Sequence, residues 1–218
     1  VVDAANCFPY GYCAVHIWNR SLEREDKATK DRHRYKKLTI ENKESNKWQA
    51  SSKATKVNLK EAAMVIIVQD REGDIYEQFA TIPDAQTNLL IRAKSDRALP
   101  EGGKLFSKLS KCKVAGTYEI KIDGDNRKGQ KKRTAKLEVR FTEVTLKNSS
   151  RTAKTAAATV KLWAVEAREV GGTSKQKVCW RLLTTIPVTT LSEALMIIEW
   201  YSWRWIIEEV FRILKKEG

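Results

Sequence analysis

The stretch that decides the fold reads Met64-Val65-Ile66-Ile67-Val68-Gln69-Asp70-Arg71-Glu72-Gly73-Asp74. Five consecutive apolar residues ahead of a polar cluster predict a strand that is buried on both faces. Asp70 then stands just past the carboxyl end of this strand, where ligand sites of open α/β sheets gather and a carboxylate is held rigidly. Asp is also a favoured residue at helix starts, so a plain capping role for Asp70 stays open.

The elements around this stretch predict an α/β arrangement for about the first 95 residues. The charged residues 21–44 read as a loop. The expected elements are a strand at 1–5, a second strand at 12–18 after the Phe8-Pro9-Tyr10-Gly11 turn, a helix at 44–63 with Trp48, Ala54 and Leu59 as possible inward residues, a short helix at 74–81 and a buried strand at 88–93.

From about Leu99 the pattern changes to an alternation of apolar and polar residues, which predicts antiparallel strands. The expected strands cover residues 117–122, 135–146, 160–167 and 178–185, with turn signals at Asp123-Gly124-Asp125-Asn126 and Gly171-Gly172. Pro187 ends this region, and residues 191–216 predict one long helix.

Composition limits the class of protein. The chain has 218 residues and 42% hydrophobic content, enough for one large core or for one core with an inserted lobe. Its apolar stretches all fall short of the ~20 residues that a membrane span needs, so we expect no membrane partner. The cysteines lack zinc-site spacing and read as free, partly buried thiols of a reducing cytoplasm. They are Cys7, Cys13, Cys112 and Cys179.

Positive charge is concentrated in one quarter of the chain. The net charge is +14, and residues 101–155 carry fifteen Lys and Arg against six Asp and Glu, an excess of nine. Clustered positive charge attracts phosphate backbones and releases their counterions, which favours nucleic acid as a partner. A solvated basic surface without a ligand is the alternative.

The last helix carries a polar stripe. At ~100° per residue, four of its side chains fall within about 60° of one another. They are Tyr201, Arg204, Glu208 and Lys215. The opposite arc is apolar and is expected to face the core. It holds Leu195, Met196, Trp200, Trp203, Ile206, Ile207, Val210, Phe211, Ile213 and Leu214. An ordinary amphipathic helix with an Arg204–Glu208 salt bridge would give the same pattern.

Taken together, the strand end and the stripe resemble a known family. The spacing Tyr-x-x-Arg-x-x-x-Glu-x-x-x-x-x-x-Lys from Tyr201 to Lys215 resembles the motif of DDE transposases of bacterial insertion sequences, the IS-four family that includes the Tn-five transposase. The segment from Gln69 to Ile75 is similar to that family's second-aspartate segment, Asp-Arg-Glu-x-Asp-Ile. Residues 91–94 and 180–185 are also similar in order and spacing.

The resemblance implies an α/β fold with a ribonuclease-H-like core, a mixed sheet with helices, interrupted by a mostly antiparallel β insert. The expected division is residues 1–95 for the first part of the core, 96–188 for the basic insert and 189–218 for the helix with the motif. Asp70 and Glu208 would be metal ligands and catalytic residues. Carboxylates suit Mg²⁺ or Mn²⁺, and the complete enzyme would bind two such ions.

The same resemblance implies double-stranded DNA as the partner, both transposon ends and target, and a homodimer of the full-length protein in the bacterial cytoplasm with the nucleoid. Tyr201, Arg204 and Lys215 would hold DNA phosphates near the bond that is cut. Arg92 is similar to a strand-end arginine that touches DNA, and Trp180 to a tryptophan associated with a flipped base. Packing in the β core is an equally good interpretation of Trp180.

This chain departs from the family at one position. The family's first Asp lies on a strand that precedes the residues found here, and Asp3 matches a non-catalytic acidic position. We therefore expect this chain alone to be inactive. A non-catalytic nucleic-acid-binding module, such as a decayed transposase, is the alternative, and a basic ribosome-like protein is a third possibility that leaves Asp70 and Glu208 unexplained.

Overall fold

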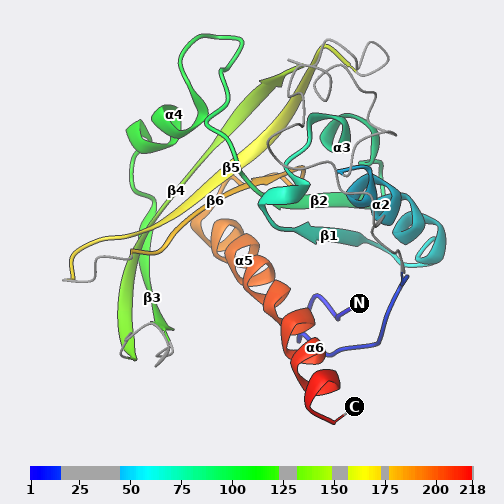
Figure 1. Ribbon diagram of the computed structural model, residues 1–218. Coiled ribbons are helices and arrows are strands. Elements are labelled where there is room, and N and C mark those ends of the chain that lie inside the picture. Colours follow the sequence, from blue (N-terminus) through cyan, green and yellow to red (C-terminus); the bar gives the residue numbers. More distant parts are fainter. Residues whose placement is uncertain (16–44, 123–131, 149–156, 173–176, 218) are drawn as a thin grey trace, which may run out of the picture.

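A computed structural model of the protein describes residues 1–15, 45–122, 132–148, 157–172 and 177–217. Six strands form one curled sheet in the order β1-β2-β6-β5-β4-β3 (Figure 1). Their bounds are β1 Val65–Gln69, β2 Thr87–Arg92, β3 Gly116–Ile122, β4 Arg133–Lys147, β5 Thr159–Glu169 and β6 Cys179–Thr184. The helices are α2 Asn46–Asn58, η2 Arg71–Gly73, α3 Tyr76–Thr81, α4 Leu105–Lys111, α5 Leu191–Ser202, η4 Trp203–Trp205 and α6 Ile206–Glu217.

The sheet is mixed, as the α/β prediction requires. β1 and β2 run parallel, with Gln69 opposite Ile91, whereas β2 pairs with β6 in antiparallel fashion. The remaining neighbours are also antiparallel, which confirms the antiparallel strands expected after Leu99. Because β6 hydrogen-bonds to β2, the sheet runs without a break from the first part of the chain into the predicted insert.

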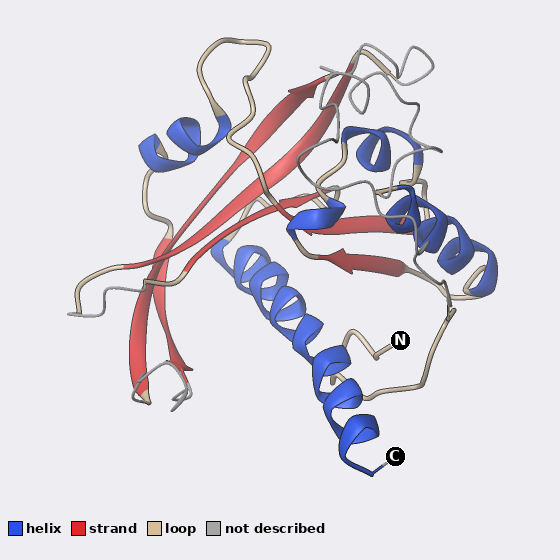
Figure 2. Cartoon of the chain, in the orientation of Figure 1, coloured by secondary structure: helices blue, strands red, loops and turns tan. Residues whose placement is uncertain are grey.

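Helices cover both faces of this sheet (Figure 2). Side chains alternate along a strand, so Ile67 and Ile91 face one cluster and Leu90 and Leu182 face the other. The first cluster includes residues of α3 and α4, such as Phe79 and Leu105. The second includes residues of α5, such as Ile197 and Tyr201. We call the second side of the sheet the α5 face.

A buried polar network fastens α2 and α3 under β1. The Gln78 amide donates to Gln69 Oε1, and Ser52 Oγ donates to Gln78 Oε1 over 2.8 Å. Gln69 Nε2 in turn donates to Ser52 Oγ over 3.1 Å. Helix 44–63 was predicted with Trp48, Ala54 and Leu59 inward; they are half-buried, and the buried residues of α2 are Gln49 and Ser52. Polar side chains can be buried there because each finds a hydrogen-bonding partner.

The amino-terminal strand at 1–5 was a wrong prediction. Val2 and Pro9 form only an isolated bridge. Asp3 accepts from the Ala5 N–H over 2.7 Å, and Asn6 accepts from the Phe8 N–H over 2.9 Å. Short polar side chains thus take up backbone donors that a strand would need. Residues 12–15 are not in a strand either, while residues 16–18 and the loop at 21–44 lie outside the described residues.

The carboxy-terminal helix is helical throughout but is interrupted by the 3₁₀ turn η4. The apolar arc packs as predicted on α5, where Trp200 is buried and Leu195 contacts the core. The prediction is wrong for α6, because Phe211 and Leu214 are 51% and 57% exposed. Figure 1 shows the reason, since α6 extends past the sheet toward the amino-terminal segment. Ile207 and Ile213 are exposed in the same way.

Helix α4 was not predicted from the sequence. It has seven residues, and only Leu105 and Leu109 are fully buried. Two apolar residues four positions apart are a weak periodic signal among lysines. The four cysteines are free thiols and half-buried, as predicted. Within the described residues, no helix has the length and apolar character needed to cross a membrane.

The start of α5 provides a test of pH dependence. Backbone hydrogen bonds from Thr189, together with its hydroxyl and Thr190, lower the pKa of Glu193 within a capping box. Because the pKa of Glu193 is lower in the folded protein than in the unfolded chain, the ionised carboxylate stabilises the fold at pH values above the unfolded pKa of about 4.3. This stabilisation is lost as the pH falls through the pKa of the folded protein. Glu193→Gln should therefore lower the melting temperature near pH 7. The difference in melting temperature between the unchanged protein and the variant should narrow toward about pH 3. A gap of constant size in thermal scans would contradict this.

Candidate functional site

Asp70 lies at the carboxyl end of β1, directly after the last paired residue. Its backbone is still extended, with φ −80° and ψ −167°, and its Oδ1 caps η2 by accepting from the Glu72 N–H over 2.8 Å. The capping role that the sequence left open is therefore real. Capping uses one carboxylate oxygen, and within the described residues Asp70 forms no ion pair, so the second oxygen can bind another group.

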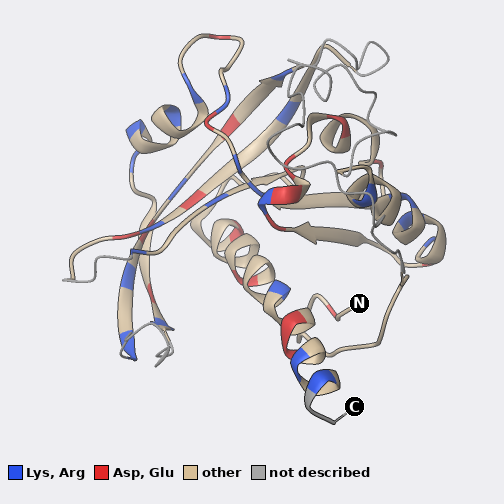
Figure 3. Cartoon of the chain, viewed as in Figure 1, with Lys and Arg blue, Asp and Glu red and all other residues tan. Residues whose placement is uncertain are grey.

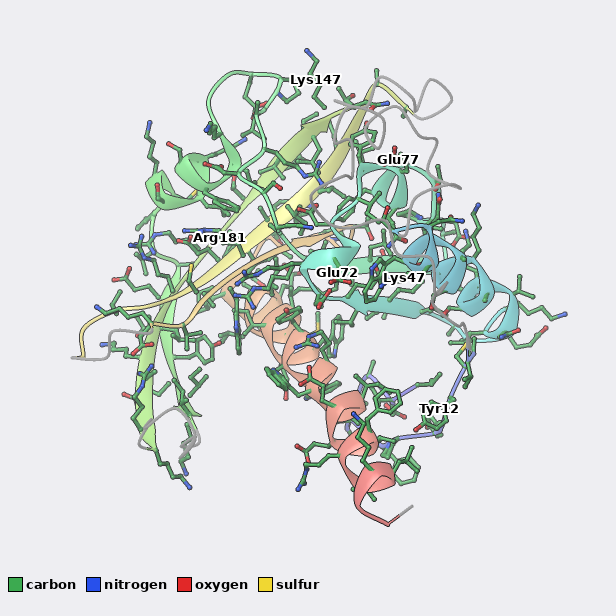
Figure 4. All side chains as sticks on the ribbon, in the orientation of Figure 1. Tyr12, Lys47, Glu72, Glu77, Lys147 and Arg181 are labelled. Carbon is green, nitrogen blue, oxygen red and sulfur yellow. The ribbon has the colours of Figure 1, made fainter. Side chains whose placement is uncertain are left out.

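The three acidic residues around this turn differ in their surroundings. The Asp74 side chain is completely buried and pairs with Arg97 over 2.6 Å. Glu72 points outward, where Lys47 lies 3.6 Å away (Figure 4). A carboxylate that is already neutralised by a buried guanidinium is a poor metal ligand. Of the three, Asp70 is the one placed at the sheet edge without a cationic partner in the described part of the chain.

Arg92 occupies the equivalent place at the end of β2. Gln69 is opposite Ile91 in the register, so Asp70 and Arg92 come next on adjacent parallel strands. By the alternation of side chains, both positions belong to the α5 face. The Arg92 guanidinium donates to the Cys179 carbonyl over 3.0 Å, which ties it to β6.

Trp180 joins this edge to the helix. Its ring lies edge-on to the Tyr201 ring, with centroids 5.9 Å apart. Trp180 is half-buried and Tyr201 is buried, so the pair packs α5 onto the end of β6. These contacts fit the interpretation that Trp180 packs in the β core. A DNA role for either ring stays a prediction.

Arg204 continues the chain of contacts from Tyr201 to Glu208. Its guanidinium lies 5.9 Å from the Tyr201 ring centre, and 2.9 Å separates its Nη1 from Glu208 Oε1. Burial lowers the pKa of Arg204, but the hydrogen bond with Glu208 and the charges of Glu208 and Tyr201 outweigh it and raise the pKa above its ordinary value. Arg204 is therefore a permanent cation next to Glu208.

The described residues bring some of the predicted site together and leave part of it apart. Contacts link Trp180, Tyr201, Arg204 and Glu208 in that order, while Lys215 lies exposed near the end of α6. The part of the chain described by the structure contains no group of three or more His, Cys, Asp or Glu that could hold a metal ion. A shared metal site of Asp70 and Glu208 stays a prediction.

Carboxylate oxygens at the site fit the chemistry of a hard divalent cation. Asp70 keeps one oxygen available, whereas Oε1 of Glu208 receives Arg204. Asp3, the acidic residue set aside above, uses its carboxylate in a local turn, where it accepts from Ala5 and from the Tyr10 hydroxyl. Asp70 and Glu208 thus stay the predicted ligands of such a cation.

Sequence reasoning missed the residues that hold Asp70 in place. Gly73 is buried against Gln69, and a Cβ at position 73 would come within 2.7 Å of the Gln69 Cβ. Asp74 anchors the same turn to Arg97. The Gly between two acidic residues was a usable signal for a tight turn, but no sequence pattern indicated Gln69 or Arg97.

A protein-family model described as "Transposase DDE domain" matches residues 49–217 of the chain. The match begins in α2, spans all six strands and ends in α6. It therefore includes every residue of the candidate site.

Gly73→Ala tests how tightly the turn after β1 is held. The added methyl group has no room beside Gln69, so we expect a loss of about 1–3 kcal/mol in unfolding free energy. The measurement is chemical denaturation. If the clash with Gln69 is the cause, Gly73→Ala should cost less in a Gln69→Gly background, which removes the Cβ as well as the amide. Equal costs in both backgrounds would show that another contact is responsible.

Proposed function

Because the chain belongs to the DDE transposase family, we propose that it forms the catalytic part of a DNA transposase. The proposed reaction is cleavage and strand transfer of phosphodiester bonds at transposon ends, the cut-and-paste movement of DNA. The observation that carries the proposal is Asp70, a carboxylate without an ion pair among the described residues, at the carboxyl end of a buried strand and beside Arg92 in register. Ligand sites of α/β sheets form at this edge.

Asp70 and Glu208 would hold Mg²⁺ or Mn²⁺ in the working enzyme, with two ions expected in the complete site. Such ions activate a water or a 3′-hydroxyl and stabilise the departing oxygen of a phosphodiester. Arg204, held beside Glu208 at 2.9 Å, would keep that carboxylate in place until DNA arrives. Its guanidinium would then donate hydrogen bonds to a phosphate oxygen, for which arginine has suitable geometry.

The basic surface supports DNA as the partner. Figure 3 shows Lys and Arg on α4 and along the β3 and β4 strands. Lys104, Lys111, Lys113, Lys121, Lys132 and Lys136 are all exposed. Exposed lysines attract phosphates without reading sequence, so this surface favours DNA as the partner. Arg92, Tyr201, Lys215 and Trp180 remain proposed DNA contacts.

The finer assignments also belong to this proposal. They are a ribonuclease-H-like core with the insert at 96–188, membership of the IS-four family with its likeness to the Tn-five transposase, a homodimer and action on the bacterial nucleoid. Support comes from a parallel pair followed by antiparallel strands and a long helix that returns to the sheet. The motif from Tyr201 to Lys215 adds to it.

Exchange of the two carboxylates tests the proposal in a complete transposase that contains this chain. Asp70→Asn and Glu208→Gln should each lower the rate of strand cleavage by at least about 100-fold, since metal binding needs the charge. DNA affinity should not fall in gel-shift titrations. The matched controls are Glu72→Gln and Glu209→Gln, which remove neighbouring charges. If the Asp70→Asn variant cleaves DNA at the full rate, the transposase proposal is wrong. The alternative function, a non-catalytic DNA-binding module, would then be the one supported.

The chain taken by itself is proposed to be inactive, because Asp70 and Glu208 supply two carboxylates of the three that the family uses. We expect no cleavage of a transposon end with Mg²⁺, while the basic surface still binds DNA. Mg²⁺-dependent cleavage by the purified chain that disappears with Asp70→Asn would contradict this expectation, because two carboxylates would then suffice.

A further inference from the structure

Asp74 has contacts that neither metal binding nor DNA binding accounts for. Its side chain has no exposed surface, and its Oδ1 pairs with Arg97 over 2.6 Å. Its other oxygen accepts from the Lys94 N–H over 2.7 Å and from the Ser95 N–H over 3.4 Å. Arg97 also donates to the Asp74 carbonyl over 2.9 Å. Every oxygen of Asp74 is thus engaged inside the protein.

These bonds connect two turns that carry site residues. Asp74 ends η2, four residues after Asp70, while Lys94 and Ser95 follow two and three residues after Arg92. The ladder between β1 and β2 ends at the pair Gln69 and Ile91. Beyond that pair, the hydrogen bonds from Lys94 and Ser95 to Asp74 join the turn after β1 to the turn after β2.

Arg97 gives this connection a fixed position in the fold. Its carbonyl accepts from the Leu105 N–H over 2.9 Å, at the start of α4, and Leu105 is fully buried. Its Nε is buried without a hydrogen-bonding partner among the described residues. Leaving a buried donor unpaired costs free energy, and the bonds from Arg97 to Asp74 offset this cost.

We propose that Asp74 and Arg97 are positioning residues that set the distance between Asp70 and Arg92. The inference rests on the proposed function, in which Asp70 binds the metal ion and Arg92 binds DNA. A metal ligand and a phosphate contact must be held to within about 0.5 Å to act on the same bond. The buried pair provides this by fixing both strand ends to one carboxylate, and it takes no part in the chemical steps.

The chain contains a matched control for this pair. Asp84 pairs with Lys56 over 2.6 Å and accepts from the Gln86 and Thr87 N–H groups over 3.0 and 2.7 Å. It stands just before β2, at the amino end of the same parallel strands. Asp84 thus has the same kinds of bonds as Asp74, on a side chain that is 45% exposed, at the end that carries no site residue.

The test compares Asp74→Asn with Asp84→Asn in the complete transposase, at a temperature where both variants stay folded. Asp74→Asn should lower kcat for strand cleavage and the affinity for Mn²⁺, measured by electron paramagnetic resonance, by about 10–100-fold. The Kd for DNA should not change. Asp84→Asn should lower the melting temperature without either loss. If Asp74→Asn lowers only the melting temperature, the positioning role is overturned.

Two further variants keep the outcomes distinct. Should Asp74→Asn fail to fold, Arg97→Lys decides. It keeps the charge, but its shorter side chain does not bring its nitrogen to the place of Arg97 Nη2, which makes both bonds to Asp74. Unchanged Mn²⁺ affinity and kcat would overturn the proposal. Asp70→Asn is measured alongside. If Asp70→Asn cleaves normally, the proposed function fails and the positioning role with it. If Asp70→Asn is inactive while Asp74→Asn cleaves normally, the positioning role alone fails.

Discussion

The parallel pairing of β1 with β2 is the constraint on which the site depends. Two adjacent strands that run in the same direction end at the same edge, so Asp70 and Arg92 leave the sheet as neighbours. Both faces of this pair are covered, by α2 and α3 on one side and by α5 on the other. The edge is therefore rigid, as a binding site requires.

Polar groups, more than apolar ones, hold the end of β1. Gln69 lies beneath Asp70 and is bonded to Gln78 and Ser52 in the interior. On the next turn, Asp74 and Arg97 form a buried ion pair. Such groups are costly to bury unless every partner is present, so they favour one geometry over near alternatives. The apolar core would permit small shifts that this network resists.

The carboxy-terminal helix divides into two parts with different surroundings. α5 packs on the sheet through Ile197, Trp200 and Tyr201, whereas α6 leaves the sheet and exposes Phe211 and Leu214. Glu208 belongs to the second part, although Arg204 and Tyr201 connect it to the first. The 3₁₀ turn η4 lies between the two parts, at the point where the helix passes the sheet.

Sequence alone determined the elements with strong local patterns and the residues with motif spacing. The apolar run before Asp70, the alternation from Thr117 to Thr184 and the periodicity after Leu191 each reflect local packing geometry, and the structure confirms them. The amino-terminal strand failed because Asp3 and Asn6 bond to their own backbone, a competition that apolar composition does not reveal.

Tertiary structure alone decided which acidic residue forms an ion pair and which has none among the described residues. Asp70 and Asp74 look alike in sequence, but Arg97 pairs with only one of them, and that contact depends on where the chain returns after β2. Glu166 is a similar case, since it shares a strand face with Leu162 and Ala164, is buried there and is paired with Arg181 from the next strand. Burial and ion pairing arise between segments distant in sequence, so no local pattern encodes them.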